Sequence, residues 1–176
     1  LDKQETALVN LRGFTLLPRL PELAQLHRQA AGRCILDGEI ISGVGGKEDF
    51  DNIKTRLAHQ SRTRAKLAAA RFPACFVAFD ILYLNGDAVT GRPLEERKAL
   101  LEKTISESEQ MPLARTVDAS GKAFYELVIR QGLEGVVGKR KQSLYYPGKR
   151  TRDWVKVKNV QEDDYVICGY MLAQHV

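Results

Sequence analysis

The stretch Phe76-Val77-Ala78-Phe79-Asp80-Ile81-Leu82-Tyr83-Leu84-Asn85-Gly86 carries the clearest information on the fold of this chain. Its aromatic and β-branched residues predict a strand over 75–84, and Asn85-Gly86 is typical of the tight turn in a β-hairpin. Side chains alternate along a strand, so we expect two faces with different occupants. One face carries Phe76, Ala78 and Asp80, and the other carries Val77, Phe79 and Ile81.

Further elements are predicted on both sides of this strand from apolar periodicity and from glycine and proline positions. We expect helices over 21–31, 50–58, 63–70, 94–105 and 122–131, a turn over 43–46, and strands over 6–10, 34–41, 135–139, 154–158 and 165–171. Strands and helices do not alternate strictly. We therefore predict an α+β fold with mixed, largely antiparallel sheets and helices packed on them.

Composition and charge exclude several classes of protein. The chain has 176 residues, of which 44% are hydrophobic, and no apolar run approaches the length of a membrane helix. Three widely spaced cysteines and no secretory signal favour a reduced, cytoplasmic protein. The net charge of +5 is concentrated in two stretches. Residues 54–71 hold six basic and no acidic side chains, and residues 139–158 hold eight basic against one acidic. Charge alone favours a polyanionic partner for the second stretch, whereas solvated helix faces account better for the first.

Glycine-rich phosphate-binding motifs are ruled out by their own spacing. Gly45-Gly46-Lys47 has Ile41 where a phosphate loop needs its first glycine, and Glu48 follows the lysine in place of Ser or Thr. A dinucleotide GxGxxG pattern from Gly43 also fails at Glu48. Phosphate binding by a glycine-rich loop is therefore not supported.

Two predicted strands carry residues that suit nucleotide binding. Glu39 lies inside the apolar segment Ile35–Ile41, where a half-buried carboxylate needs a partner, although an edge-strand glutamate that faces water fits equally. Phe79 is either a core phenylalanine or a platform on which a base stacks. Both alternatives remain open at this point.

Two later strands carry candidate residues of opposite charge: an acidic residue just before the first and two lysines within the second. Glu134 precedes the run Gly135–Lys139, where it serves either as a divalent-metal ligand or as a helix-end glutamate. In Asp153-Trp154-Val155-Lys156-Val157-Lys158, alternation places Trp154, Lys156 and Lys158 on one face. Two lysines that point the same way repel each other unless they share an anion, so a phosphate ligand competes with a simple solvated edge strand. Carboxylates, an aromatic plate and paired lysines together suit a nucleoside triphosphate with its metal.

Taken in order, these segments resemble the nucleotidyltransferase motifs of ATP-dependent DNA ligases, most of all the ligase domain of bacterial end-joining ligases that work with Ku. Residues 35–41 are similar to motif III of that family, 76–86 to motif IIIa, 134–140 to motif IV and 153–159 to motif V. The resemblance implies an ATP-grasp-like adenylation domain followed by an OB domain. We expect residues 1–161 to form the adenylation domain, and 162–176 a linker and the first OB strand.

The resemblance also implies roles for individual residues. Glu39 contacts the ribose and assists with metal, Phe79 stacks on adenine, and Glu134 binds the catalytic Mg²⁺ or Mn²⁺. Lys156 and Lys158 hold the α-phosphate as catalytic cations, with Trp154 and Arg12 also at the nucleotide. The resemblance and the basic charge together predict DNA contacts from Arg19, Lys139, Arg140, Lys149, Arg150 and Arg152.

Two departures from the family pattern stand out. The family nucleophile is a lysine in K-x-D-G, a motif absent from these residues, so we expect the adenylation domain to lack its N-terminal edge and to be inactive alone in self-adenylation. The family sequence S-R-x-G corresponds here to Asn10-Leu11-Arg12-Gly13, with Leu11 at the arginine position.

The implied activity is formation of lysyl-AMP, transfer of AMP to a DNA 5′-phosphate, and sealing of nicked or broken double-stranded DNA. Expected partners are that DNA, Ku, and polymerase or nuclease domains of the parent protein, at the bacterial nucleoid and without a membrane. A related RNA ligase or capping-type nucleotidyltransferase is one alternative. A non-catalytic basic DNA-binding module is another.

Overall fold

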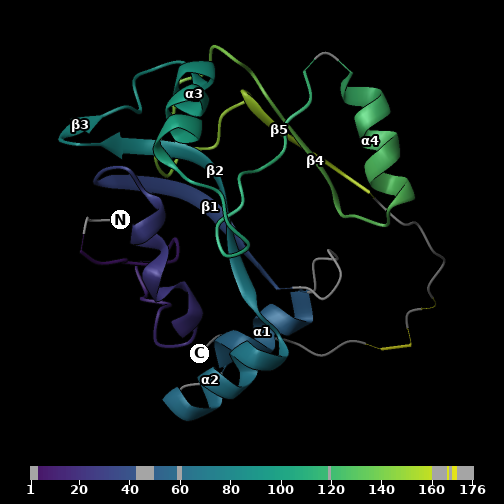
Figure 1. Cartoon of the computed structure of the whole chain (residues 1–176). Coiled ribbons are helices and arrows are strands. Elements are labelled where there is room, and N and C mark those ends of the chain that lie inside the picture. Colours follow the sequence, from purple (N-terminus) through teal and green to yellow (C-terminus); the bar gives the residue numbers. More distant parts are fainter. Residues whose placement is uncertain are drawn as a thin grey trace.

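The computed structural model describes residues 4–42, 50–58, 61–118, 120–159, 166, 168 and 169. Strands β1 (Cys34–Ser42), β2 (Ala74–Leu84) and β3 (Asp87–Ala88) form an antiparallel sheet in that order. Strands β4 (Gly135–Lys139) and β5 (Trp154–Lys158) form a separate antiparallel pair, which we call the ribbon. Figure 1 shows the long strands β1 and β2 side by side, with the ribbon next to helix α4.

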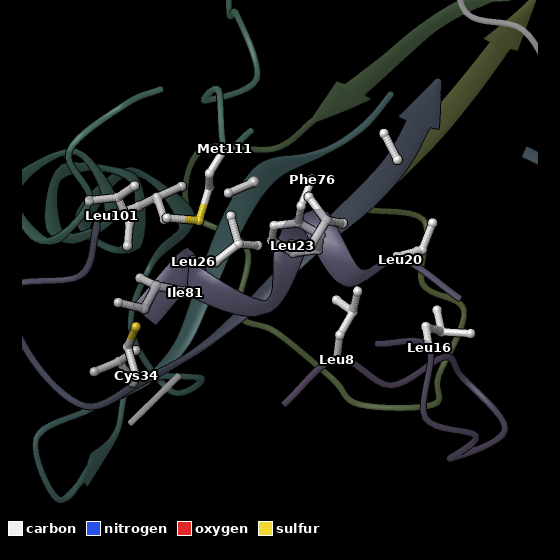
Figure 2. Packing of buried hydrophobic residues seen from close by; sticks show 14 residues of the cluster. Leu8, Leu16, Leu20, Leu23, Leu26, Cys34, Phe76, Ile81, Leu101 and Met111 are labelled. Carbon is white, nitrogen blue, oxygen red and sulfur yellow. The ribbon is translucent and has the colours of Figure 1, made fainter. Parts of the chain in front are cut away.

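The core lies on the face of β2 that carries Phe76 and Ala78. The 3-10 helix η1 (Pro21–Gln29) covers this face, and Figure 2 shows its Leu23 and Leu26 against Phe76 and Ile81. Proline in the first turn of η1 fits because its missing N–H has no helical partner there. Burial of these side chains supplies the main driving force for folding of this half.

Four α-helices complete the described structure. Helices α1 (Phe50–Ala58) and α2 (Arg62–Arg71) follow β1, and α3 (Leu94–Thr104) packs against β2. Helix α4 (Gly121–Arg130) packs against β4. None of the described helices is long and apolar enough to cross a membrane.

Most predicted elements are confirmed within one or two residues, including the hairpin turn, where Asn85 and Gly86 have φ angles of 50° and 115°. The strand expected over 6–10 is wrong, because this segment makes only the isolated bridge Val9–Thr15. The expected helix over 21–31 is a 3-10 helix. The turn over 43–46 lies outside the described residues, as do the linker over 162–164 and nearly all of the strand over 165–171.

The prediction that Phe76 and Ala78 share a face is confirmed, and both are buried in the core. It is wrong for Asp80, which is buried on the other face, because its partner Asp37 is adjacent to Gly38, the partner of Ala78. Ile81, expected on the opposite face, is fully buried as well. The cause lies in the register with β1, which runs from Gly38–Ala78 to Asp37–Asp80 and leaves Phe79 unpaired as a bulge. A bulge interrupts alternation and re-aims the side chains beside it.

Candidate functional site

The ribbon has one face that gathers the predicted phosphate-binding lysines. Cross-strand partners share a face, and the register pairs Lys139 with Trp154, Val137 with Lys156, and Gly135 with Lys158. A groove of about 650 Å³ opens on this face. Its lining, which we call the cationic groove, is Leu144, Tyr145, Tyr146, Gly148, Lys149, Arg150, Thr151, Trp154, Lys156 and Lys158. The predicted grouping of Trp154, Lys156 and Lys158 on one face is therefore confirmed.

Gly135 is required where β4 meets β5. Its φ angle is 146°, and a Cβ atom there would lie 2.1 Å from the carbonyl oxygen of Val157. Only glycine combines this backbone conformation with so close an approach. Gly135 therefore sets how closely Glu134, which precedes it, approaches the lysines of β5.

Glu134 forms the acidic part of the site. Its Oε1 atom accepts a hydrogen bond of 2.8 Å from Lys156 Nζ and lies 3.9 Å from Lys158 Nζ. The hydrogen bond from Lys156, with the charges of both lysines, holds the pKa of the Glu134 carboxyl below its ordinary value. Glu134 is therefore an anion at neutral pH, and all three groups remain accessible to a ligand.

An aromatic cluster lies beside the lysines. Trp154 makes edge-on contacts with Phe79 and Tyr145, with ring centroids 6.1 Å and 5.8 Å apart. Lys139 Nζ lies 3.7 Å from the centroid of the Trp154 ring and 4.1 Å from that of Phe79, within cation–π range of both. Phe79 is thus partly buried at the edge of the site, while Phe76 in the same strand belongs to the core.

Burial changes the acidity of two groups in this cluster. It lowers the pKa of Lys139 to about 8, although the carboxylates of Asp80 and Asp37 partly oppose that shift. Burial and the hydrogen bond from Tyr145 Oη to Asp37 Oδ2, 2.7 Å long, raise the pKa of the Tyr145 phenol. Tyr145 therefore remains a neutral hydrogen-bond donor that ties the groove to β1.

Three other predicted site residues are not among those that line the cationic groove. Glu39 is exposed on β1, the edge strand, and Arg12 is exposed in a turn whose amide donates to Asn10 Oδ1. Arg19 is partly buried and lines a separate hollow with Phe14 and Leu57. Glu39 therefore has the environment of an edge-strand glutamate that faces water.

Of the predicted DNA contacts, Lys149 and Arg150 lie in the cationic groove and Arg152 is exposed nearby in the chain. Arg140 is exposed and pairs with Asp153, with Nε and Oδ1 3.4 Å apart. Lys139, by contrast, points between two aromatic rings. The groove consequently carries four cations: Lys149, Arg150, Lys156 and Lys158.

The donor set fits Mg²⁺ only in part. Within the described residues no group of three His, Cys, Asp or Glu side chains could hold a metal ion. Glu134 supplies one ionised carboxylate beside two cations that suit phosphate. Mg²⁺ is commonly bound by one or two carboxylates together with substrate phosphates, so this set fits a metal that arrives with a nucleotide.

Sequence reasoning missed the buried pair Asp80–Arg97. Both side chains are fully buried, and Arg97 donates to the two Asp80 carboxylate oxygens at 2.8 and 2.9 Å. A signal was available, because alternation placed Asp80 on the same face as two apolar residues, and a buried carboxylate needs a partner. Nothing in the local pattern indicated that this partner was Arg97.

Comparison with known proteins identifies the class. The family model described as the ATP dependent DNA ligase domain matches residues 5–158. The chain is 35% identical to DNA ligase C2 of Mycolicibacterium smegmatis, an alignment that covers 97% of this chain and 49% of the relative. It is 34% identical to DNA ligase C of Mycobacterium tuberculosis, over 85% of this chain and 43% of the relative.

A solved structure supports the same assignment. The mycobacterial DNA ligase D complexed with ATP and MES superimposes with a TM-score of 0.72 and 27% identity, covering 89% of this chain and 48% of that one. The chain belongs to the ATP-dependent DNA ligase family, and its fold is that of the ligase adenylation domain. It spans about half the length of the relatives it matches.

Proposed function

We propose that this chain is the adenylation core of an ATP-dependent DNA ligase. The observation that carries the proposal is the convergence of Glu134, Lys156 and Lys158 on one ribbon face, beside the aromatic cluster of Phe79 and Trp154. The family match over residues 5–158 supports the same activity. The boundary near residue 161 with an OB domain remains a prediction.

In this proposal the α-phosphate of ATP lies against Lys156 and Lys158. The two ammonium groups stabilise the charge that develops on the phosphate oxygens during transfer, a contribution of roughly 3–4 kcal/mol per well-placed donor. The Phe79 ring offers a stacking surface for adenine, worth about 1–3 kcal/mol. Glu39 would reach the ribose from the edge strand.

The ion pair of Glu134 and Lys156 suggests how the site accepts its ligand. The Glu134 carboxylate accepts a hydrogen bond from Lys156. Glu134 would hold the Mg²⁺ or Mn²⁺ that accompanies ATP, and Lys156 would bind the phosphate, so each charged group would have a partner of opposite sign in the ligand. The metal supplies Lewis-acid neutralisation of the phosphate charge.

The proposed reaction has three steps. A lysine amine attacks the α-phosphorus of ATP and releases pyrophosphate. An oxygen of the DNA 5′-phosphate then attacks that phosphorus, which breaks its bond to the lysine nitrogen and frees the lysine. Finally the 3′-hydroxyl attacks the phosphorus of the 5′-phosphate, and AMP leaves as the phosphodiester bond forms. All three steps occur at the same phosphorus-binding cations, so Lys156 and Lys158 serve throughout.

We further propose that the substrate is nicked or broken double-stranded DNA. Lys149 and Arg150 extend the positive charge of the groove beyond the phosphate lysines, and Arg152 and Arg140 add exposed charge on the same segment. Such a basic track suits the DNA backbone. Ku and polymerase or nuclease domains are the proposed partners, at the bacterial chromosome.

The test is nucleotide transfer from α-labelled ATP in the presence of Mg²⁺. The chain is compared with a version extended at its N-terminus along the sequence of its own gene. We expect label on the extended chain only, followed by sealing of a nicked DNA duplex. An extended chain that remains unlabelled overturns the proposal, whereas labelling by GTP or sealing of RNA alone would assign a capping enzyme or an RNA ligase.

A further inference from the structure

The fully buried guanidinium of Arg97 joins parts of the molecule that are distant in sequence. Besides the two bonds to Asp80, its Nη1 atom donates to the backbone carbonyl of Ser143 at 3.0 Å and to that of Arg92. Asp80 Oδ1 also accepts a hydrogen bond from its neighbour amide of Ile81. Every nitrogen of Arg97 is therefore engaged, in a site from which water is excluded.

Ser143 belongs to residues 140–153, the segment that joins β4 to β5, which we call the strap. The first turn of α3 holds the strap, because the amides of Leu94 and Glu95 donate to the carbonyls of Ser143 and Lys141. These amides have no partner within the helix, so the strap satisfies them. Arg97, one turn further along α3, adds the buried charge-assisted contact.

The strap in turn sets the position of the aromatic cluster. Tyr145 lies in the strap with its ring 5.8 Å from Arg97 Cζ, its edge-on contact with Trp154, and its hydroxyl bonded to Asp37. On the other side, Asp80 immediately follows Phe79, the bulged residue of β2. Arg97 thus reaches both members of the Phe79–Trp154 contact. It binds Asp80, which follows Phe79 in the chain, and it lies against Tyr145, whose ring contacts Trp154.

We propose that Arg97 is a positioning residue for the nucleotide site: by binding Asp80 and Ser143 together, it fixes the base platform at Phe79 relative to the phosphate cations that follow Trp154. This inference rests on the proposed function, because the distance from Phe79 to Lys156 and Lys158 matters only if one nucleotide contacts all three. Arg97 itself is fully buried, so its guanidinium is not open to a ligand. Its effect passes through Phe79 and the strap.

Arg56 provides a matched control for a purely structural role. It is also fully buried, binds the carboxylate of Glu22 at 2.6 and 2.9 Å, and donates to the carbonyls of Phe72 and Arg19. It ties α1 to η1 rather than to the ribbon. Replacing either arginine by lysine removes the same kind of forked contact.

The experiment uses Trp154, the single tryptophan, as a reporter in the whole chain. Arg97→Lys and Arg56→Lys are compared with wild type by circular dichroism, by acrylamide quenching of tryptophan emission, and by ATP–Mg²⁺ titration. We expect both variants to lose stability, but only Arg97→Lys to increase Trp154 quenching. We expect only that variant to weaken ATP binding, by about tenfold.

Equal quenching and equal ATP affinity in the two variants would overturn the inference. If Arg97→Lys does not fold, Tyr145→Phe is used to test whether the strap positions the aromatic cluster. This variant removes only the hydrogen bond from the Tyr145 hydroxyl to Asp37. Raised quenching with weaker ATP binding supports the inference, and wild-type values for both refute it. A wild-type chain that binds no ATP would instead count against the proposed function, while the quenching comparison still reports on the strap.

Discussion

The three-stranded sheet and the ribbon differ in how they are stabilised. Around β2 the side chains are closely buried, and even charged groups there are fully paired, as in Asp80–Arg97. On the ribbon, Val137, Val155 and Val157 remain exposed, as do Glu134 and both lysines of β5. A two-stranded pair of this kind is marginal by itself in water.

The difference separates the residues that maintain the structure from those that act on a ligand. The sheet supplies a rigid frame, whereas the ribbon keeps its charges accessible and takes its placement from the strap and from the Phe79–Trp154 contact. Substitutions in the sheet should therefore act mainly on stability. Substitutions on the ribbon face should act mainly on nucleotide chemistry.

The largest expected effect is on the sheet. Asp80→Asn leaves Arg97 buried without its counter-charge, which should lower the free energy of unfolding by about 3–5 kcal/mol. Asp153→Asn removes the partner of the exposed Arg140 and should cost at most about 1 kcal/mol. Urea denaturation measures both. Similar losses of unfolding free energy in the two variants would contradict the proposed difference between buried and exposed ion pairs.

The ribbon should show the opposite response. Lys156→Ala or Lys158→Ala should slow AMP transfer by the extended chain about 100-fold or more, because a cation at the α-phosphate is lost. Stability should change by no more than about 0.5 kcal/mol at these exposed positions. Arg64→Ala on α2 is the control, and it should mainly weaken DNA binding. Equal losses of transfer in all three variants would contradict the assigned roles.

Two phenylalanines of β2 sharpen the comparison within one strand. Phe79→Ala should raise the ATP concentration required for labelling about 5- to 150-fold, which corresponds to loss of a stacking contact of 1–3 kcal/mol. Phe76→Leu, in the core, should instead cost about 1 kcal/mol of stability and leave that requirement unchanged. An unchanged ATP requirement in Phe79→Ala would place Phe79 with the core residues.

The smallest effect concerns pH. The pKa of Lys139 is lowered from 10.5 to about 8 by burial, so between these values the unfolded chain binds more protons than the folded one. Stability should therefore rise with pH across this window, by about 1 kcal/mol after allowance for partial exposure. Lys139→Met should remove the rise, as measured by urea denaturation at pH 7.5 and 10.5. The exposed Lys149→Met serves as control and should retain it.

The sequence predicted the parts of this structure that depend on local patterns. Periodicity located the strands and helices, and the alternation of Trp154, Lys156 and Lys158 identified the ribbon face. The sequence pattern did not predict Ile81 in the core. Ile81 turns to the core because of the bulge at Phe79, and a bulge depends on the register between strands. Lys139 was predicted to contact DNA from the resemblance and its charge, whereas antiparallel pairing places it opposite Trp154, with its ammonium group near the rings of Trp154 and Phe79.

The candidate site was only partly accessible from sequence. Glu134, Lys156 and Lys158 meet as a group, but the contacts that hold the group in place were not foreseen. The bonds from Arg97 to Ser143 and from Tyr145 to Asp37 join residues 46 and 108 positions apart. Such pairings are fixed by the folded arrangement of the whole domain, and no local pattern encodes them.

Gly135 has a consequence for how this chain can be altered. A slip of the ribbon by one residue would turn both lysines to the opposite side and bring a side chain against the Val157 carbonyl, where none fits. The lack of a side chain at Gly135 thus fixes the register of β4 with β5. Efforts to retune the chemistry by insertion or deletion within β4 should fail, whereas changes in the length of the strap leave this register intact.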